Sequence, residues 1–214
     1  MTDLRITEIF YSLQGESRTV GLPTVFVRLT GCPLRCGYCD TAYAFSGGKI
    51  QSLEVILEEV AQYSPKYITV TGGEPLAQPD CKELLIQLCD RGYEVSLETS
   101  GSIDITDIDN RVSIVMDLKT PGSGEVARNL YSNMQLLQTN DQVKFVICDR
   151  LDYDWAKFKL SEYSITEKVI DVLFSASHGQ LAPEILADWI IQDNLPVRLQ
   201  VQLHKYLWGD KPGV

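Results

Sequence analysis

Three cysteines close together near the start of the chain have the spacing of a metal-cluster site. Cys32, Cys36 and Cys39 follow the pattern C-x3-C-x2-C, and no fourth ligand of comparable spacing follows them. Electron-transfer ferredoxins close all four irons of a [4Fe-4S] cluster with cysteine. Three thiolates would leave one iron free for a small molecule, as catalytic zinc sites keep a vacant position. The spacing therefore predicts an iron–sulfur cluster that acts on a ligand.

The alternative interpretation of these cysteines is a structural zinc site or a set of buried thiols. Structural zinc takes four closed ligands, usually in paired C-x2-C motifs or with histidines. The sequence has two histidines, His178 and His204, and we expect each to be a loop or structural residue. The other three cysteines are expected to pack in the core as small apolar side chains, which unpaired cysteine often does; they are Cys81, Cys89 and Cys148.

Composition narrows the class of protein. A chain of 214 residues predicts a single domain spanning residues 1–214. No apolar run approaches 18 residues, so no membrane span is expected. The net charge of −10 argues against a nucleic-acid partner, which would require a basic surface. The first residues lack the pattern of a signal peptide, and we expect a cytoplasmic location, where thiols stay reduced.

Strand-like apolar runs alternate with segments of helical period along most of the chain. The expected strands are 24–29, 66–71, 93–98, 112–117, 142–148, 169–174 and 197–203. The expected helices are 52–64, 79–91, 126–137, 152–162 and one that begins at 183. This alternation predicts βαβ units and a mostly parallel sheet. Because a closed eight-unit barrel needs around 250 residues, we expect an α/β fold with an incomplete barrel of roughly six units.

Several unusual loops begin where these strands end. They are Gly31-Cys32, Gly72-Gly73-Glu74-Pro75, Thr99-Ser100-Gly101 and Lys119-Thr120-Pro121. Chemistry in parallel α/β sheets lies at the carboxyl ends of the strands, so these loops are expected to form one site. The glycine pair at 72–73 permits close approach of the backbone to a ligand, or alternatively a tight strand-to-helix turn.

Two motifs together resemble the signature of the radical S-adenosylmethionine (SAM) enzymes. These are the cysteine run, with aromatic Tyr38 before its last cysteine, and Thr71-Gly-Gly-Glu-Pro75. The residues 10–16, 39–41, 98–101 and 202–208, together with Arg28, are similar more narrowly to the 7-carboxy-7-deazaguanine synthase family, from Ile9 to Trp208. This resemblance implies a homodimer and an incomplete (β/α)6-type radical SAM partial barrel. Ser17 stands where the family usually has glycine, so that loop is expected to differ somewhat.

The resemblance also implies a reaction. A radical SAM lyase of this family converts 6-carboxy-5,6,7,8-tetrahydropterin to 7-carboxy-7-deazaguanine with release of ammonia, in the pathway to queuosine and other 7-deazapurines. It implies a 5′-deoxyadenosyl radical that abstracts hydrogen at C6, regeneration of SAM, and a ring contraction assisted by Mg²⁺. The implied partners are the small-molecule pterin and a reductant protein such as flavodoxin or ferredoxin, with no nucleic acid and no membrane.

Residue roles are carried over from the family position by position, and none is a side-chain acid or base. Cys32, Cys36 and Cys39 would hold the [4Fe-4S] cluster, and Thr41 would bind Mg²⁺. The positions implied to contact SAM are Tyr38, Asp40, Gly73, Asp117, Leu118 and Lys119. Those implied to contact the substrate are Leu13, Gln14, Gly15, Glu16, Arg28, Thr71, Phe174, Ser175, Ala176 and Ser177. Arg28 suits a substrate carboxylate because its planar guanidinium makes bidentate hydrogen bonds.

Two other functions remain open on the sequence. An activase of glycyl-radical enzymes would share the cysteine run and a small barrel, but it would not need the segment 13–16, Arg28 or the segment 202–208. A non-enzymatic iron–sulfur or other metal-binding protein would need only the cysteines.

Overall fold

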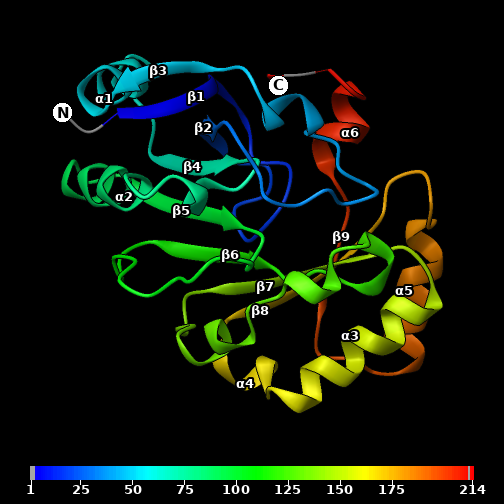
Figure 1. The fold of residues 1–214 in the computed structure, drawn as a ribbon. Coiled ribbons are helices and arrows are strands. Elements are labelled where there is room, and N and C mark those ends of the chain that lie inside the picture. The colour runs from blue at the N-terminus through cyan, green and yellow to red at the C-terminus, as the bar shows by residue number, and fades with distance from the viewer. Residues whose placement is uncertain (1–2, 212) are drawn as a thin grey trace.

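One sheet passes through the whole fold and is not closed. The structure is a computed structural model, which describes residues 3–211 and 213–214. The strand order in the described chain is β3-β1-β2-β4-β5-β6-β7-β8-β9, with β3 and β9 at the two edges (Figure 1). The strands from β2 through β4 to β9 pair in parallel, whereas β1 is antiparallel to β2 and β3. The predicted α/β partial barrel is confirmed.

The elements have the following bounds. The strands are β1 (Asp3–Leu13), β2 (Pro23–Leu29), β3 (Lys49–Ser52), β4 (Tyr67–Gly72), β5 (Glu94–Thr99), β6 (Ser113–Asp117), β7 (Gln142–Ile147), β8 (Asp171–Ala176) and β9 (Arg198–Gln200). The α-helices are α1 (Leu53–Ala61), α2 (Cys81–Asp90), α3 (Arg150–Glu162), α4 (Ile165–Lys168), α5 (Pro183–Gln192) and α6 (Leu203–Trp208). Short 3₁₀ turns are η1 (Ala42–Phe45), η2 (Pro75–Ala77), η3 (Pro121–Ser123), η4 (Val126–Arg128) and η5 (Tyr131–Gln135). None of the helices in these described residues has both the length and the apolar character needed to cross a membrane.

The helices cover the sheet with their apolar faces and leave the strand ends accessible. Helix α1 buries Leu53, Ile56, Leu57 and Val60, and the Ser52 hydroxyl caps it by accepting a hydrogen bond from the Val55 amide. Cys81 and Cys89 are buried on α2, as predicted. Cys148 differs from the prediction: it is only half-buried, because β7 ends at Ile147 and the following amide turns to bond the Asp152 carboxylate.

The helix predicted over 126–137 is wrong, and two 3₁₀ turns with buried asparagines occupy this segment. Asn129 accepts a hydrogen bond from the Lys119 amide (2.9 Å) and donates one to the Lys119 carbonyl (2.8 Å). Asn133 donates to the Gly101 carbonyl (3.2 Å) and accepts from the Ile105 amide (3.3 Å). Such side-chain bonds to backbone compete with helix formation. The segment thereby fixes the loops that follow β5 and β6.

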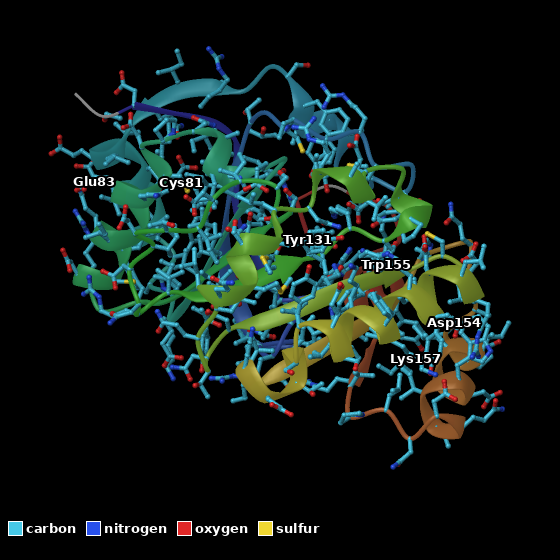
Figure 2. The ribbon with its side chains drawn as sticks, turned by 60° about the horizontal axis from the view of Figure 1, so that its bottom comes forward. Cys81, Glu83, Tyr131, Asp154, Trp155 and Lys157 are labelled. Carbon is cyan, nitrogen blue, oxygen red and sulfur yellow. The ribbon has the colours of Figure 1, made fainter. Side chains whose placement is uncertain are left out.

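An aromatic cluster holds this irregular segment against helix α3. Tyr131 of η5 and Trp155 of α3 lie in the same part of the molecule (Figure 2), and both rings are close to Lys159. The Lys159 ammonium is 4.7 Å from the Tyr131 ring centroid and 5.6 Å from that of Trp155. Cation–π attraction of this kind stabilises the contact. The segment is therefore anchored from both sides although it has no helical hydrogen-bond ladder.

The two ends of the chain supply elements that the sequence did not predict. Strand β1 pairs with β2 through a register in which Leu13 lies opposite Pro23, which makes residues 14–22 a compact loop. The expected strand 197–203 is shorter, because β9 ends at Gln200 and Leu203 begins α6. The Leu203 amide bonds to the Gly15 carbonyl (3.0 Å). The last helix is thus attached to the first loop.

Ser17 lies in that first loop with a left-handed backbone. Its φ is 65°, in the region that glycine occupies without a steric penalty. Its amide donates a hydrogen bond to the Gln200 side chain (2.8 Å), which fixes this conformation. The serine therefore adopts a glycine-type geometry here and carries the strain of a Cβ atom in it.

We expect Ser17→Val to lower the free energy of unfolding by about 1–2 kcal/mol relative to Ser17→Gly, because a β-branched side chain at this φ is strained. Thermal denaturation checks this, at roughly 2–4 °C per kcal/mol for a chain of this size. Ser17→Ala controls for loss of the hydroxyl, which contacts Thr19. Equal melting temperatures for the valine and glycine variants would contradict the strain.

Candidate active site

A cavity of about 350 Å³ lies at the carboxyl ends of the parallel strands. Its walls come from the strands themselves, including β7, from the loops after β1, β2, β4, β5, β6 and β8, and from the segment after β9. Of the twenty site residues predicted from the sequence, eighteen line this one cavity. They are Leu13, Gln14, Gly15, Glu16, Arg28, Cys32, Cys36, Tyr38, Cys39, Asp40, Thr41, Thr71, Gly73, Asp117, Lys119, Ser175, Ala176 and Ser177.

Two of the predicted site residues have side chains that lie outside the cavity lining. The side chains of Leu118 and Phe174 are buried in the hydrophobic core and do not line the cavity. Phe174 packs edge-on against Phe145, with ring centroids 5.4 Å apart. Successive residues of a strand point to opposite faces, so Phe174 faces the core while its neighbour Ser175 faces the cavity.

At one end of the cavity are the three cysteines, all partly buried. The loop that carries them is ordered by a bond from the Gly37 amide to the Ser123 carbonyl (3.0 Å) and one from the Leu34 amide to the Cys32 sulfur (3.4 Å). Burial raises the pKa of the Cys32 and Cys36 thiols, and the Lys119 charge partly opposes this at Cys36. Binding of a metal cluster must therefore displace the protons of these two thiols.

The three-thiol donor set fits an iron–sulfur cluster. No group of three His, Cys, Asp or Glu side chains in residues 3–211 and 213–214 is arranged to hold a metal ion. A cubane differs from one ion in that each cysteine binds a different iron, so the sulfur atoms need not converge on one point. Cysteines at 32, 36 and 39 that face a shared cavity meet this requirement.

Two buried polar atoms beside the cysteines have no partner among the described residues. They are the Tyr38 hydroxyl and the Asp117 Oδ1 atom, and both residues line the cavity. The other Asp117 oxygen accepts from the Lys119 ammonium (3.1 Å), which lies 5.9 Å from the Tyr38 ring centroid. Buried polar groups are normally hydrogen-bonded. A polar ligand bound beside the cysteines would satisfy both atoms.

The glycine pair at 72–73 packs against the cysteine loop. A Cβ atom on Gly73 would clash with the Gly31 carbonyl and with Cys32. The close fit is held by the Glu74 amide, which donates to the Gly31 carbonyl (2.8 Å). The structure shows a role that neither prediction included, a close backbone approach to a neighbouring loop. Gly73 also borders the cavity, so its contact with a ligand stays a prediction.

Glu74, which sequence reasoning did not assign to the site, holds three strand ends together. Its side chain is 0% exposed. Its carboxylate accepts hydrogen bonds from the Leu76 amide (3.0 Å), the Thr99 hydroxyl (2.9 Å) and the Ser100 amide (2.7 Å), and also from the Ser100 hydroxyl. The side chain thus connects β4 to the end of β5, while its backbone connects β4 to the loop after β2.

Buried charges line another part of the cavity wall, called the charged end. Glu16 pairs with Lys144 of β7, and each side chain is 14% exposed. Glu98 accepts from the Thr71 hydroxyl (2.9 Å) and the Gln14 amide (3.3 Å). Burial and the Glu16 charge raise the pKa of Glu98. Burial opposes the charge on Lys144, but its carboxylate neighbours outweigh this and raise its pKa.

Arg28 is held in place by a carboxylate from the neighbouring strand. Its Nε atom donates to Glu8 Oε1 (2.7 Å), the same oxygen that accepts from the Tyr43 hydroxyl (2.7 Å). Its guanidinium carbon lies 5.8 Å from the Phe10 ring centroid. Among the described residues its two terminal nitrogens make no hydrogen bond, so they are available to an anion in the cavity.

Thr41 and Asp40 form a bonded pair next to the last cysteine. The Thr41 hydroxyl donates to Asp40 Oδ1 (2.7 Å), which leaves the threonine lone pairs for another partner. Asp40 is exposed as a whole residue, and partial desolvation of its carboxyl opposes ionisation, but the Thr41 hydrogen bond and the nearby lysines outweigh this and lower its pKa. The pair therefore offers hard oxygen atoms of the kind that magnesium binds.

The structure adds cavity residues that the sequence prediction had not assigned to the site. They include Glu98, Lys144, His178, Gln202, His204 and Val214. His204 packs against Gly15, where any Cβ atom would clash with its ring, and burial lowers the pKa of this histidine. Lys144 had a signal in the sequence: a lone lysine inside the apolar run 142–148 of a strand predicted to be buried.

Comparison with known proteins places the chain in a family. A profile of the radical SAM superfamily matches residues 26–119. The 7-carboxy-7-deazaguanine synthase of Chlorobaculum tepidum is 42% identical, over 99% of this chain and 97% of that protein. The chain belongs to the 7-carboxy-7-deazaguanine synthase family. The synthase of Koribacter versatilis is 40% identical, over 96% of this chain and 97% of its own length. The crystal structure of QueE from Escherichia coli shares the fold, with a TM-score of 0.77 at 21% identity over 94% of this chain and 95% of that one.

Membership of the 7-carboxy-7-deazaguanine synthase family confirms the resemblance predicted from the motifs and makes the chain a radical SAM enzyme of the lyase class. The superfamily implies a [4Fe-4S] cluster and SAM. The three cysteines and the unpartnered atoms of Tyr38 and Asp117 suit these two groups. The glycyl-radical activase and the non-enzymatic protein are therefore set aside.

We expect Cys36→Ala to abolish the broad visible absorption and most of the iron of anaerobically reconstituted protein, because one cubane corner loses its ligand. Cys89→Ala is the matched control, since this cysteine is buried on α2 away from the cavity. Iron analysis and absorption spectra measure both. Full iron content in the Cys36 variant, or one zinc per colourless wild-type chain, would contradict the cluster assignment.

Glu98 should make stability depend on pH. Because the folded-state pKa lies above the ordinary value of 4.5, the folded protein keeps a proton that the unfolded chain releases. This contribution to stability is lost as pH rises from about 4.5 through the folded-state pKa. We expect Glu98→Gln to gain stability relative to wild type as pH rises from about 4.5, until the pH passes the folded-state pKa, in denaturant titrations. Glu58→Gln, at an exposed site on α1, controls for loss of one charge. A constant difference between Glu98→Gln and wild type would contradict this environment.

Proposed function

We propose that this chain, acting as one domain, converts 6-carboxy-5,6,7,8-tetrahydropterin to 7-carboxy-7-deazaguanine and ammonia, for the synthesis of queuosine or other 7-deazapurines. The observation that carries the proposal is that three cysteines and a set of buried, paired charges line one cavity. The near-full-length relatives bear the name of this reaction. Loss of one ammonia accounts for every atom of the conversion, so no net oxidant is required.

At the thiol end, Cys32, Cys36 and Cys39 would hold the cluster. When bound, the cluster and SAM supply hydrogen-atom abstraction, here from C6 of the pterin. The chain's own residues orient the groups: Gly73 leaves room beside the cysteine loop, and Asp117 and Tyr38 offer their unpartnered oxygens to the nucleoside. Lys119 supplies a positive charge next to Asp117. Such residues bind and position the reactive groups and exclude water.

At the charged end, residues would recognise the pterin. The free terminal nitrogens of Arg28 suit its carboxylate, since a guanidinium binds a carboxylate through two parallel hydrogen bonds. Glu16 and Glu98 accept hydrogen bonds, so they suit the N–H groups of the pyrimidinone edge. Gln14 and Thr71, both already bonded to Glu98, keep that carboxylate aimed at the cavity. Ser175, Ala176 and Ser177 also line the cavity and would contact the pterin.

The Thr41 hydroxyl would bind Mg²⁺, with Asp40 beside it. Magnesium keeps several waters and takes few protein ligands together with substrate oxygens. A cation held here lies on the cavity wall, next to the last cluster cysteine. Its charge would orient the substrate carboxylate and stabilise negative charge during the ring contraction.

The proposal includes partners and a location. A reductant protein such as flavodoxin or ferredoxin would supply the electron, in the cytoplasm, where thiols stay reduced. A homodimer is supported by the exposed apolar residues of the C-terminal helix. There Tyr206 is 86% exposed, Leu207 43% and Trp208 38%. Exposed apolar groups that cluster in this way commonly mark an interface.

The experiment that tests the function is anaerobic turnover. Reconstituted protein is incubated with dithionite, SAM, Mg²⁺ and 6-carboxy-5,6,7,8-tetrahydropterin, and products are identified by mass spectrometry. Formation of 7-carboxy-7-deazaguanine in multiple turnovers is the expected result. Cleavage of SAM without this product would remove the proposed substrate.

We expect Arg28→Ala to raise the KM for the carboxypterin by about 10- to 100-fold, the effect of losing a hydrogen-bonded charge partner. Slow SAM cleavage in the absence of pterin should remain close to wild type, because Arg28 does not touch the thiol end. Arg198→Ala, on the edge strand β9, is the control for loss of a cation. An equal loss of both activities in Arg28→Ala would mean that Arg28 does not serve the pterin.

A further inference from the structure

The segment after β9 crosses from one end of the cavity to the other. Its Gln202 side chain uses a single nitrogen, Nε2, to hold two carboxylates. It donates to Glu16 Oε1 (2.9 Å) and to Asp40 Oδ2 (3.1 Å). A primary amide nitrogen carries two protons, so one proton serves each carboxylate. The two acidic residues, 24 positions apart in the sequence, therefore share one donor.

Each of these carboxylates is anchored to a different part of the site. Glu16 is paired with Lys144 and also accepts from the Gln200 amide (3.2 Å), at the charged end. Asp40, beside the cysteines, accepts a hydrogen bond from the Thr41 hydroxyl. A continuous set of polar contacts thus runs from Lys144 through Glu16, Gln202 and Asp40 to Thr41. The Gln202 Nε2 atom joins the part of this network around Glu16 to the part around Asp40.

A neutral amide is suited to this position. Two carboxylates brought close together repel each other, and an amide donor bonds both without adding a charge to either side. Gln202 is held in turn by its backbone, because the next residue, Leu203, donates its amide proton to the Gly15 carbonyl (3.0 Å). The motif 202–208 was part of the sequence resemblance, yet nothing in the reaction chemistry described above uses Gln202.

We propose that Gln202 is a positioning residue that couples the two ligand positions, so that a cation at Thr41 tightens binding of the pterin ring at Glu16, and the reverse. The inference rests on the proposed function, since it takes the ligands from it. A ligand at either end fixes one carboxylate, and through the shared nitrogen it fixes the other. The second ligand then meets an ordered partner, and the coupling is reciprocal by thermodynamic necessity.

The test separates this route from a direct contact between cation and substrate. Anaerobic holoenzyme with SAM but without reductant is titrated with 6-carboxypterin and, separately, with pterin that lacks the carboxylate. Binding is followed by the fluorescence of the pterin, with and without Mg²⁺. The unsubstituted pterin has no carboxylate to bond the cation, so any effect of Mg²⁺ on its Kd passes through the protein.

For wild type we expect Mg²⁺ to tighten the unsubstituted pterin by about 5-fold or more, the lower end of typical coupling between sites. In Gln202→Met, which keeps the length of the side chain without its donors, the effect should fall below about 2-fold. Gln202→Asn keeps the amide on a chain too short to reach both carboxylates and should lose coupling likewise. Gln192→Met, at an exposed glutamine that ends α5, should keep the wild-type value.

The outcomes are distinguishable. Failure of wild type to bind 6-carboxypterin would overturn the proposed function, and this inference with it. Binding of both pterins without any effect of Mg²⁺ on the unsubstituted one would overturn the inference alone, and this result needs no variant to fold. Full coupling in a folded Gln202→Met or Gln202→Asn protein would also overturn it, because the two carboxylates would then communicate without the shared donor.

Discussion

The site depends on a buried carboxylate that fixes the relative positions of three strand ends. Glu74 has no exposed surface, and its oxygens are fully engaged by the backbone and hydroxyl donors of Leu76, Thr99 and Ser100. Its own amide holds the Gly31 carbonyl next to the first cysteine. Removing a buried acceptor of this kind leaves its donors unsatisfied, which costs far more than an ordinary hydrogen bond contributes. The cysteine loop and the glycine pair thus occupy fixed positions relative to the end of β5.

These fixed loop positions give the cavity two regions of different chemistry, one lined by thiols and one by paired charges. The parallel register brings the carboxyl ends of neighbouring strands to one edge, so residues far apart in sequence share one wall. Sulfur ligands and unpartnered oxygens gather where the loops after β2 and β6 meet. Paired charges gather where the loop after β1 meets β5 and β7. A cofactor that abstracts hydrogen and a polar substrate can therefore be held side by side, shielded from water.

Much of this arrangement could be predicted from the sequence, because the informative residues obey local rules. The cysteine spacing and the glycine pair mark their own chemistry, and strand–helix alternation places them at one edge of a sheet. The segment 126–137 shows where such rules fail. Its apolar period favours a helix, but Asn129 and Asn133 bond to backbone groups of distant loops, which a local pattern does not reveal.

The sequence also could not reveal the network of ion pairs and hydrogen bonds that lines the cavity. Glu98 looks like an ordinary strand residue until the sheet register brings it to the cavity, and Lys144 shows only that it is a lone lysine in an apolar run, without its partner. Phe174 lies one residue from a cavity position, and the alternation of β8 turns its side chain into the core. Leu118, directly after β6, lies between two cavity positions with its side chain in the core. The partnership of Gln202 with Glu16 and Asp40 joins three loops, so it exists only once the chain has folded.

The central claim is that one cavity holds the nucleoside cofactor at its thiol end and the pterin at its charged end. An anaerobic crystal structure of the reconstituted protein with SAM and 6-carboxypterin tests this most directly. The account predicts that Tyr38 and Asp117 gain hydrogen-bond partners from the nucleoside while Arg28 contacts the pterin carboxylate. A pterin bound outside the cavity, or a nucleoside that leaves Tyr38 and Asp117 unpartnered, would contradict it.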